Sequence, residues 1–296
     1  MAKAMSECNP GRNHSDQLGC LWKAGRYCWR LDQEAESIVM AILNVTPDSF
    51  SDGGLHVDLE AALEAARRFV QEGASILDVG GESTRPGAKE VSEADELRRV
   101  VPLIRELGSR EPVALSVDTC KPVVAREALL AGASIVNDVT GFRDPAMIDV
   151  CASSDCGVVV MHMQGNPRMM QKNPQYVDVL SEVREFFQER FEKLTEAGVD
   201  PQRIVFDPGI GFGKTLAHNL ALLHGIDAYR MNDRPILMGL SRKSLIGQLI
   251  GEPGLLRREN PTQALTALTR SRGAMIHRVH RVSEALQILR MTEAIR

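Results

Sequence analysis

Eight short apolar runs in this chain each lead into polar residues, and stretches with helical periodicity separate them. The runs are Ile42-Leu43-Asn44, Ile76-Leu77-Asp78, Leu115-Ser116-Val117-Asp118, Ile135-Val136-Asn137-Asp138, Val159-Val160-Met161-His162, Ile204-Val205-Phe206-Asp207, Ile236 to Leu240 with Ser241-Arg242-Lys243, and Met275-Ile276-His277-Arg278-Val279-His280. Continuous rather than alternating apolar runs are typical of parallel strands buried on both faces. Eight such strands with helices between them predict an α/β fold, a (β/α)8 TIM barrel with its active site at the strand ends.

Local signals predict the helices that separate these strands. They are the apolar spacing from Asp58 to Gln71, a capping box at Ser92, Pro122 in a first turn, the spacing from Val177 to Ala197, Asn260 as an N-cap before Pro261, and Val282 to Ala294. The structural alternative is a doubly wound open sheet. That fold usually has a glycine-rich turn after its first strand, whereas the turn here begins Asn44-Val45-Thr46-Pro47-Asp48.

Composition excludes several classes of protein. With 296 residues, 44% hydrophobic and 25% charged, the chain is of ordinary globular type and fits a single barrel domain. A net charge of −4 does not favour nucleic acid or an anionic membrane, and no apolar stretch approaches the ~18 residues of a membrane span. The six cysteines match no zinc pattern, which favours free thiols in a reducing cytoplasm.

The N-terminal region differs from the rest of the chain. Residues 1–36 are polar and without periodicity, so we expect a weakly ordered arm, with a short strand around Tyr27 to Leu31 that plugs the bottom of the barrel. Residues 37–296 are expected to form the barrel itself.

Two groups of side chains are expected to meet at the barrel mouth. Lys243, Arg278 and His280 follow the last two strands, where such barrels commonly bind phosphate, and two fixed cations with an imidazole suit an anion. Asp118, Asn137 and Asp207 end three other strands, and two carboxylates with an amide suit a ligand rich in N–H donors. His162 is either a general base or a supporting residue, while Asp78 and Asp138 are weaker candidates.

Three familiar motifs fail on inspection. A phosphate loop around Gly209 to Thr215 would need glycine where Pro208 stands, and the dinucleotide pattern would need glycine at Lys214. The sequence Gly239-Leu240-Ser241-Arg242-Lys243 lacks the final glycine of a nucleophile elbow, so Ser241 is expected to be structural. The loops after the first two strands are rich in Gly, Ser, Thr and Pro, and they are candidate lids.

Long segments of the chain resemble the dihydropteroate synthase family. They are Ile42-Leu43-Asn44-Val45-Thr46-Pro47-Asp48-Ser49-Phe50-Ser51-Asp52-Gly53-Gly54, Asp78-Val79-Gly80-Gly81-Glu82-Ser83-Thr84-Arg85-Pro86-Gly87, Ser116-Val117-Asp118-Thr119, Met161-His162-Met163-Gln164-Gly165, Asp207-Pro208-Gly209-Ile210-Gly211-Phe212-Gly213-Lys214 and Ser241-Arg242-Lys243-Ser244. The resemblance runs from about Ile38 to Arg296. Blocks of this length in this order are a far more specific signal than any single short motif.

The resemblance implies a folate-pathway transferase, a cytoplasmic homodimer and sulfonamide target that joins p-aminobenzoate to (7,8-dihydropterin-6-yl)methyl diphosphate. It implies these two small molecules as binding partners, no nucleic acid and no membrane, and Mg²⁺ as the cofactor. By carry-over, the pterin contacts are Asp118, Asn137, Asp207 and Lys243, the walls are Met161 and Phe212, the diphosphate contacts are Arg278 and His280, a further substrate contact is Ser244, the metal ligand is Asn44, and the p-aminobenzoate loop carries Thr84 and Arg85. Lys243, Arg278, His280 and Arg85 are the residues expected to take part in catalysis.

Some positions depart from the family pattern, and two other functions remain possible. Arg281 stands where the family usually has Asp, and Arg270 and Arg272 lie on a helix that is usually small and apolar there. The alternatives are a corrinoid-type pterin methyltransferase domain and a non-catalytic pterin-binding paralogue. The paired diphosphate cations and the Thr84-Arg85 loop argue against the first, and intact Asn44, Arg85, Lys243 and His280 argue against the second.

Overall fold

A computed structural model of the chain describes residues 20–32, 34–45, 55–83, 90–165, 169–252 and 254–295. Eight parallel strands form its central sheet, in the order β8-β7-β6-β5-β4-β3-β10-β9. A parallel bridge between Phe206 and Ile236 joins the two ends of that order and closes the barrel. The strands are β3 (Ile38–Asn44), β4 (Ile76–Gly80), β5 (Ala114–Asp118), β6 (Ile135–Asp138), β7 (Gly157–Met161), β8 (Ile204–Asp207), β9 (Leu237–Met238) and β10 (Ile276–Val279). The predicted (β/α)8 barrel is confirmed, and the open sheet is excluded.

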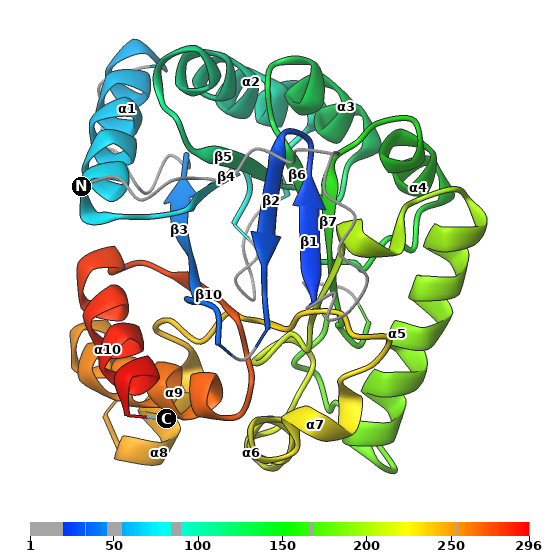
Figure 1. The fold of residues 1–296 in the computed structure, drawn as a ribbon, viewed down its shortest axis with the longest axis vertical. Helices are drawn as coiled ribbons and strands as arrows, with labels where there is room; N and C mark the ends of the chain where they lie inside the picture. The colour runs from blue at the N-terminus through cyan, green and yellow to red at the C-terminus, as the bar shows by residue number, and fades with distance from the viewer. Residues whose placement is uncertain are drawn as a thin grey trace.

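Helices form a ring around the barrel (Figure 1). They are α1 (Leu55–Glu72), α2 (Glu93–Arg110), α3 (Pro122–Leu130), α4 (Pro145–Ala152), α5 (Val179–Glu196), η1 (Pro201–Arg203), α6 (Leu216–His224), α7 (Ile226–Tyr229), α8 (Ser244–Ile250), η2 (Leu255–Arg258), α9 (Glu259–Ser271) and α10 (Val282–Ala294). Ser92 caps α2 by accepting the N–H of Asp95, as its sequence predicts. The prediction for α9 is wrong by two residues: η2 runs directly into this helix, so Arg258 is the N-cap, and Asn260 and Pro261 lie inside the first turn.

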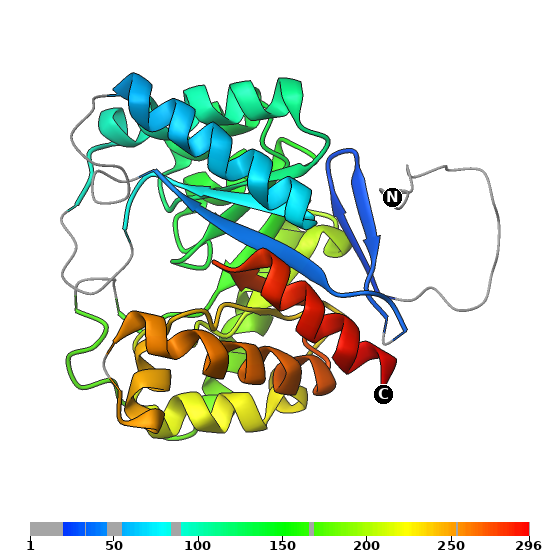
Figure 2. The same ribbon diagram turned by 90° about the vertical axis from the view of Figure 1, so that its left-hand side faces the viewer.

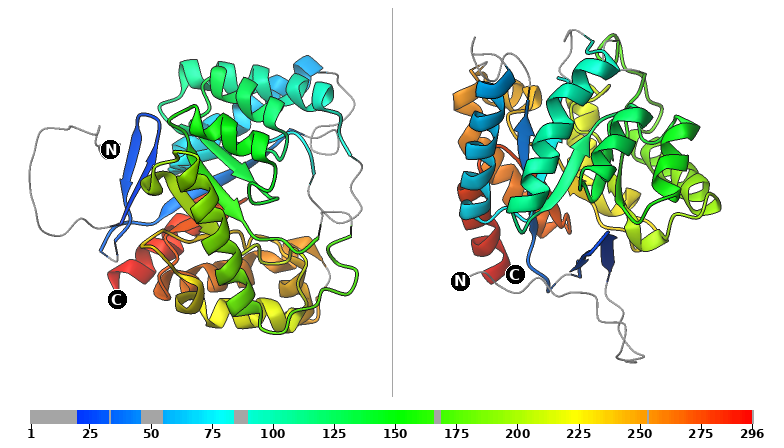
Figure 3. Two further views of the ribbon diagram at one scale, coloured as in Figure 1. Left: turned by 90° about the vertical axis from the view of Figure 1, so that its right-hand side faces the viewer. Right: turned by 90° about the horizontal axis from the view of Figure 1, so that it is seen from above.

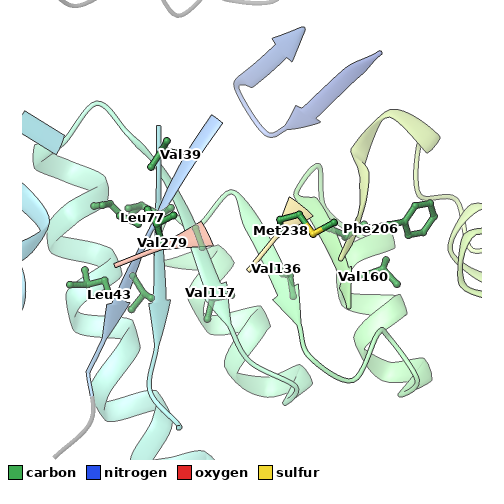
Figure 4. Packing of buried hydrophobic residues seen from close by; sticks show 14 of the residues in the cluster. Val39, Leu43, Leu77, Val117, Val136, Val160, Phe206, Met238 and Val279 are labelled. Atoms are coloured by element: carbon green, nitrogen blue, oxygen red, sulfur yellow. The ribbon is translucent and has the colours of Figure 1, made fainter. Parts of the chain in front are cut away.

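Side chains alternate between the two faces of each strand, and the two faces pack differently. Outward residues such as Val39, Val117 and Phe206 pack under the helices (Figure 4). Inward residues near the strand starts, such as Ile76, Ile135 and Val205, form a separate apolar layer inside the barrel. The barrel is therefore filled with apolar side chains at the end where its strands begin.

A β-hairpin closes that end of the barrel, as side views show (Figures 2 and 3). Its strands are β1 (Leu21–Ala24) and β2 (Tyr27–Arg30), and Trp22 and Tyr27 belong to the same apolar layer as the first residues of the barrel strands. Trp22 Nε1 donates to the carbonyl of Arg203 over 3.0 Å, and the Tyr27 hydroxyl donates to that of Val113 over 2.8 Å. Strand β2 lies where the sequence predicts a strand, whereas no sequence pattern predicts β1. The boundary expected at residue 36 stays a prediction.

Among the described helices, none is long and apolar enough to cross a membrane.

Candidate active site

The interior of the barrel becomes polar two residues beyond its apolar layer. Because inward side chains recur at every second residue, the positions that follow Ile76, Ile135, Val205 and Ile276 on the inner face are Asp78, Asn137, Asp207 and Arg278. On β5 the same rule places Ser116 and then Asp118. The side chains of Asp78, Asp118, Asn137 and Asp207 are all buried. The apolar floor and the polar mouth are consecutive layers of one barrel.

Arg278 forms ion pairs with acidic residues of two other strands at the barrel mouth. Its Nε donates to Asp78 Oδ2 over 2.6 Å, and one of its terminal nitrogens donates to Asp118 Oδ2 over 2.6 Å. Asn137 Nδ2 donates to the same oxygen of Asp78 over 3.2 Å. Asp78 was a weaker candidate in the sequence, and it was read as the last residue of its strand. In the structure β4 continues to Gly80, which places Asp78 one layer down, directly against Arg278.

The charges in this network are not fully compensated by one another. Burial raises the pKa of Asp118 and outweighs the lowering effect of Arg278, and the neighbouring Asp78 raises it further. Burial by itself lowers the pKa of Arg278, but Asp78 and Asp118 raise it above its usual value, so the guanidinium stays charged. Among the described residues, neither Oδ1 of Asp78 nor Oδ1 of Asp118 has a hydrogen-bond partner. Buried acceptors without partners are costly, and they are suited to N–H donors from a ligand.

A cavity of about 360 Å³ opens above this network. It brings together Asn44, Asp118, Phe212, Lys243, Ser244, Arg278 and His280. Asn137, Met161 and Asp207 do not line it: Asn137 contacts Asp78, Met161 packs in a buried cluster that Phe212 covers, and Asp207 Oδ1 accepts the N–H of Gly209 over 2.7 Å. Thr84 and Arg85 lie outside the described residues, so their predicted roles are not tested here.

Lys243 lies over an aromatic ring at the cavity wall. Its Nζ is 4.0 Å from the centroid of the Phe212 ring, which is the geometry of a cation–π contact. Burial lowers the pKa of Lys243 to about 8, although the nearby Asp207 acts in the opposite direction. A lysine of this kind changes charge near neutral pH, which is common at functional sites.

His280 is oriented by a residue of the neighbouring strand's loop. Its Nδ1 lies 2.8 Å from Ser241 Oγ, and its backbone N–H donates to the same oxygen over 3.4 Å. Ser241 therefore has a supporting contact, in keeping with the structural role expected for it.

The described structure favours the supporting role for His162. It is buried, its Nδ1 lies 3.0 Å from Lys214 Nζ, and it does not line the cavity. Burial lowers its pKa to about 2, assisted by Lys214, so the ring is neutral. Asp138 also has a local role, because its carboxylate accepts the N–H groups of Thr140 and Phe142.

A second charged cluster went unnoticed in the sequence. Lys121 Nζ lies 2.5 Å from Glu82 Oε2 and also pairs with the buried Glu96, while Glu82 Oε1 accepts the N–H of Val91 over 3.1 Å. Glu82 lines the cavity, so this cluster fixes one edge of the mouth. Its residues come from three separate segments, and no local pattern brings them together.

The departures from the family pattern lie away from the cavity. Arg281 is exposed, pairs with Glu284 over 3.3 Å and does not line the cavity. Arg270 is fully buried, where it pairs with Glu293 over 2.8 Å and donates to the carbonyl of Ala35. Arg270 therefore joins α9 to α10 and to the chain before β3.

The described residues include no group of three or more His, Cys, Asp or Glu side chains that could hold a metal ion. Asn44, at the end of β3, lines the cavity and offers an amide oxygen. Such a donor set does not form an all-protein cage. It fits a Mg²⁺ ion of the kind that binds mostly to water and substrate phosphates with one protein ligand.

The chain is similar, in sequence and in structure, to enzymes of one family. The chain matches the pterin binding enzyme family over residues 40–280. The dihydropteroate synthase of Escherichia coli K12 is 45% identical over 256 residues, which are 86% of this chain and 90% of that protein. The structure of Xanthomonas albilineans dihydropteroate synthase with 4-aminobenzoic acid has a TM-score of 0.87 at 42% identity, covering 94% of this chain and 98% of that one. The structure of Burkholderia cenocepacia dihydropteroate synthase complexed with 7,8-dihydropteroate has a TM-score of 0.85 at 40% identity, covering 95% of this chain and 98% of that one.

Proposed function

The chain belongs to the pterin binding enzymes and, among them, to the dihydropteroate synthases, and from this we propose how its barrel mouth carries out their reaction. The reaction joins p-aminobenzoate to (7,8-dihydropterin-6-yl)methyl diphosphate and releases diphosphate. The observation that carries the proposal is one cavity lined by a buried carboxylate, Asp118, and by the cations Lys243 and Arg278. Identity to synthases over most of the chain favours this function over the methyltransferase and the binding paralogue.

The acidic side of the mouth is proposed to hold the pterin. The 2-amino group and ring N–H groups of a pterin are donors, and Asp118 Oδ1 is a buried acceptor without a described partner. Asn137 and Asp207 support this side from strands β6 and β8, and both are buried. Phe212 forms a wall of the cavity, and Met161 lies in the buried cluster behind it.

The cationic side is proposed to hold the diphosphate. Arg278, His280 and Lys243 line the cavity, and negative charge grows on the leaving group as its bond to carbon breaks. Arg278 has five N–H donors in a planar fork, of which two point to Asp78 and Asp118. The same guanidinium thus has donors for phosphate oxygens while it remains fixed to the pterin side.

We infer that the carbon–oxygen bond breaks largely before the aryl amine arrives. The pterin spreads the resulting positive charge over its rings, and the carboxylate of Asp118 stabilises it. The amine nitrogen of p-aminobenzoate then forms the new bond and loses a proton to the released diphosphate, so no covalent enzyme intermediate is needed. Ser244, which lines the cavity at the start of α8, is a proposed substrate contact, and the resemblance alone assigns Thr84 and Arg85 to p-aminobenzoate.

Mg²⁺ is the proposed cofactor, with the amide oxygen of Asn44 as its protein ligand. When bound with the substrate, it would neutralise part of the charge of the diphosphate. The chain's own contribution on this side is the set of fixed donors on Lys243, Arg278 and His280.

The proposal is tested by incubating the protein with the pterin diphosphate, Mg²⁺ and p-aminobenzoate and measuring 7,8-dihydropteroate. We expect product in an amount equal to the diphosphate released. Tight pterin binding without product would instead favour the binding paralogue. Trapping a covalent pterin adduct on the enzyme would contradict the proposed order of bond breaking.

The finer assembly and location are also proposed. Leu249, Ile250, Leu256 and Leu268 expose large apolar side chains on α8, η2 and α9, where η2 contacts both of the other helices, and we propose that a second copy of the chain covers them. Sedimentation is expected to give the mass of a homodimer for the wild type and the mass of a monomer for Leu256→Glu.

A cytoplasmic location is also proposed. Cys20, Cys120, Cys151 and Cys156 are thiols, in keeping with the reducing cytoplasm.

A further inference from the structure

The amino group of Lys214 is buried beside the active site, and the proposed reaction does not use it. Burial lowers the pKa of Lys214 to about 7, although Asp207 acts in the opposite direction, so the group is an ammonium ion below that pH. Only 3% of this residue is exposed, and it does not line the main cavity. Charged lysines are rarely buried without a specific set of partners. Lys214 follows β8 in the segment that failed as a phosphate loop, so neither the sequence patterns nor the proposed mechanism explains it.

Lys214 has a complete set of acceptors around it. Its Nζ lies 2.9 Å from the carbonyl oxygen of Phe212, 3.1 Å from that of Gly209 and 3.3 Å from that of His162. It also lies 3.0 Å from His162 Nδ1. Because His162 is neutral and carbonyl oxygens only accept, the lysine is the donor in this set. One side chain therefore links the loop after β8 to the residue after β7.

The backbone of this loop is packed as closely as glycine permits. Gly209 has φ +63°, and a Cβ atom there would lie 1.9 Å from the carbonyl oxygen of His162. A Cβ on Gly213 would lie 2.7 Å from the carbonyl oxygen of Gln164. The two loops touch through bare backbone, so the ammonium of Lys214 stands where carbonyl groups of both loops converge.

The loop that Lys214 holds carries part of the active site. Phe212 lines the main cavity and lies under the ammonium of Lys243, and Gly211 packs against the same lysine, since a Cβ there would be 3.3 Å from Lys243 Cδ. A shift of this loop would move the ring and then the cation above it. Displacements of about 1 Å in such positioning groups cost on the order of 100-fold in rate.

We propose that Lys214 is a positioning residue for pterin transfer, whose ammonium group fixes residues 209–213 so that Phe212 and Lys243 meet the substrate. This rests on the proposed function, since Phe212 and Lys243 are assigned there to the pterin site. Lys214 itself touches neither substrate. It acts through the backbone of the loop.

The structure provides a route for a direct test. A second cavity, of about 180 Å³, is lined by Lys214 together with Gln171, Thr215, Asn219 and Gln248. Replacing Lys214 by alanine would enlarge this cavity by the volume of a propylammonium ion. Propylammonium added to the solution has a path to the vacated position, while 1-propanol has the same shape without the charge.

The experiment measures kcat/KM of Lys214→Ala with and without propylammonium or 1-propanol, and its thermal midpoint. We expect kcat/KM to fall about 100-fold, and propylammonium to restore it at least tenfold where 1-propanol does not. Lys172→Ala, which removes an exposed lysine from the neighbouring loop, is the matched control and should keep wild-type activity under all three conditions. Lys214→Met fills the space without a charge and should be as impaired as Lys214→Ala but insensitive to the amine.

Several outcomes would overturn the proposal. They are wild-type kcat/KM in both Lys214 variants, equal rescue by the amine and the alcohol, or failure of both variants to fold, which would limit Lys214 to stability. A double-mutant comparison adds a second measurement: in a Phe212→Ala background, Lys214→Ala should cost much less than it does alone. An inactive wild-type chain would instead defeat the proposed function and leave these comparisons without a basis.

Discussion

Each end of this barrel holds an arginine, but the two arginines have different kinds of hydrogen-bond partner. At the hairpin end, Arg203 donates to the carbonyl oxygens of Cys156, Ser154 and Cys151 at 2.6, 2.8 and 2.6 Å. At the mouth, Arg278 binds carboxylates that keep one buried oxygen each without a described partner. Groups fully satisfied by the chain stabilise the fold, whereas groups left with spare donors and acceptors are suited to a ligand. Residues at the hairpin end of the barrel therefore serve stability, and residues at the mouth serve function.

The largest effect is expected from Arg278→Met at the mouth. It removes the proposed diphosphate contact and leaves the buried carboxyl groups of Asp78 and Asp118 without their cation. We expect kcat/KM to fall at least 100-fold and the free energy of unfolding to fall by about 3–5 kcal/mol. Steady-state kinetics and urea unfolding measure the two losses. Arg281→Met, at the same strand end but exposed, is the matched control and should change both only slightly.

Trp22→Ala at the hairpin end is expected to give a large loss of stability and no loss of activity. The side chain is fully buried in the apolar floor, so truncation should lower the free energy of unfolding by about 3–5 kcal/mol. The kcat/KM of the protein that remains folded should equal that of the wild type. Trp29→Ala in the same hairpin, where the side chain is half-buried, should cost less. A loss of kcat/KM in Trp22→Ala would break the separation between the two ends.

The pH dependence of the mouth should reveal Lys243. Since its pKa is lowered to about 8, its cation disappears above that pH, and kcat/KM for the pterin diphosphate should then fall up to tenfold per pH unit. Lys243→Arg keeps its charge, so the part of this decline that begins near pH 8 should be absent from its profile. The free energy of unfolding should change with pH in the opposite direction to kcat/KM. Between about pH 8 and 10.5 Lys243 keeps its proton in the unfolded chain but has lost it in the folded chain, so the folded state becomes more stable as the pH rises. Identical profile shapes for both proteins would contradict the assignment.

The smallest effect is expected at Arg281, the N-cap of α10. This residue makes no side-chain cap, and Glu284 stands three residues later. Arg281→Ser would complete a capping box with Glu284, so the free energy of unfolding should rise by about 1 kcal/mol. The thermal midpoint should rise by about 1–2 °C with unchanged kcat/KM, and Arg281→Ala should give no such rise. A large loss of activity in Arg281→Ser would place this residue in the diphosphate site after all.

The parts of the site that sequence could predict are those that depend on strand position. Asp118 and Arg278 were found because each follows an apolar run, and the resemblance gave them roles. Asp78 was underrated because its strand continues to Gly80, and where a strand ends depends on its neighbours in the sheet. Lys214 was missed because its partners, His162 and the loop carbonyls, meet it only when two βα loops pack together.

The barrel, the end at which chemistry is expected and the family could all be predicted from the amino-acid sequence. These follow from the alternation of strands and helices and from long ordered motifs, which are properties of neighbouring residues. The pairing of the charges could be seen only in the folded chain. Arg278 joins Asp78 to Asp118, and Lys214 donates to the carbonyl oxygen of Phe212. Arg270 is buried, whereas Arg281 is exposed. Those pairings bring together residues as much as 200 positions apart, so they depend on barrel closure rather than on any local pattern.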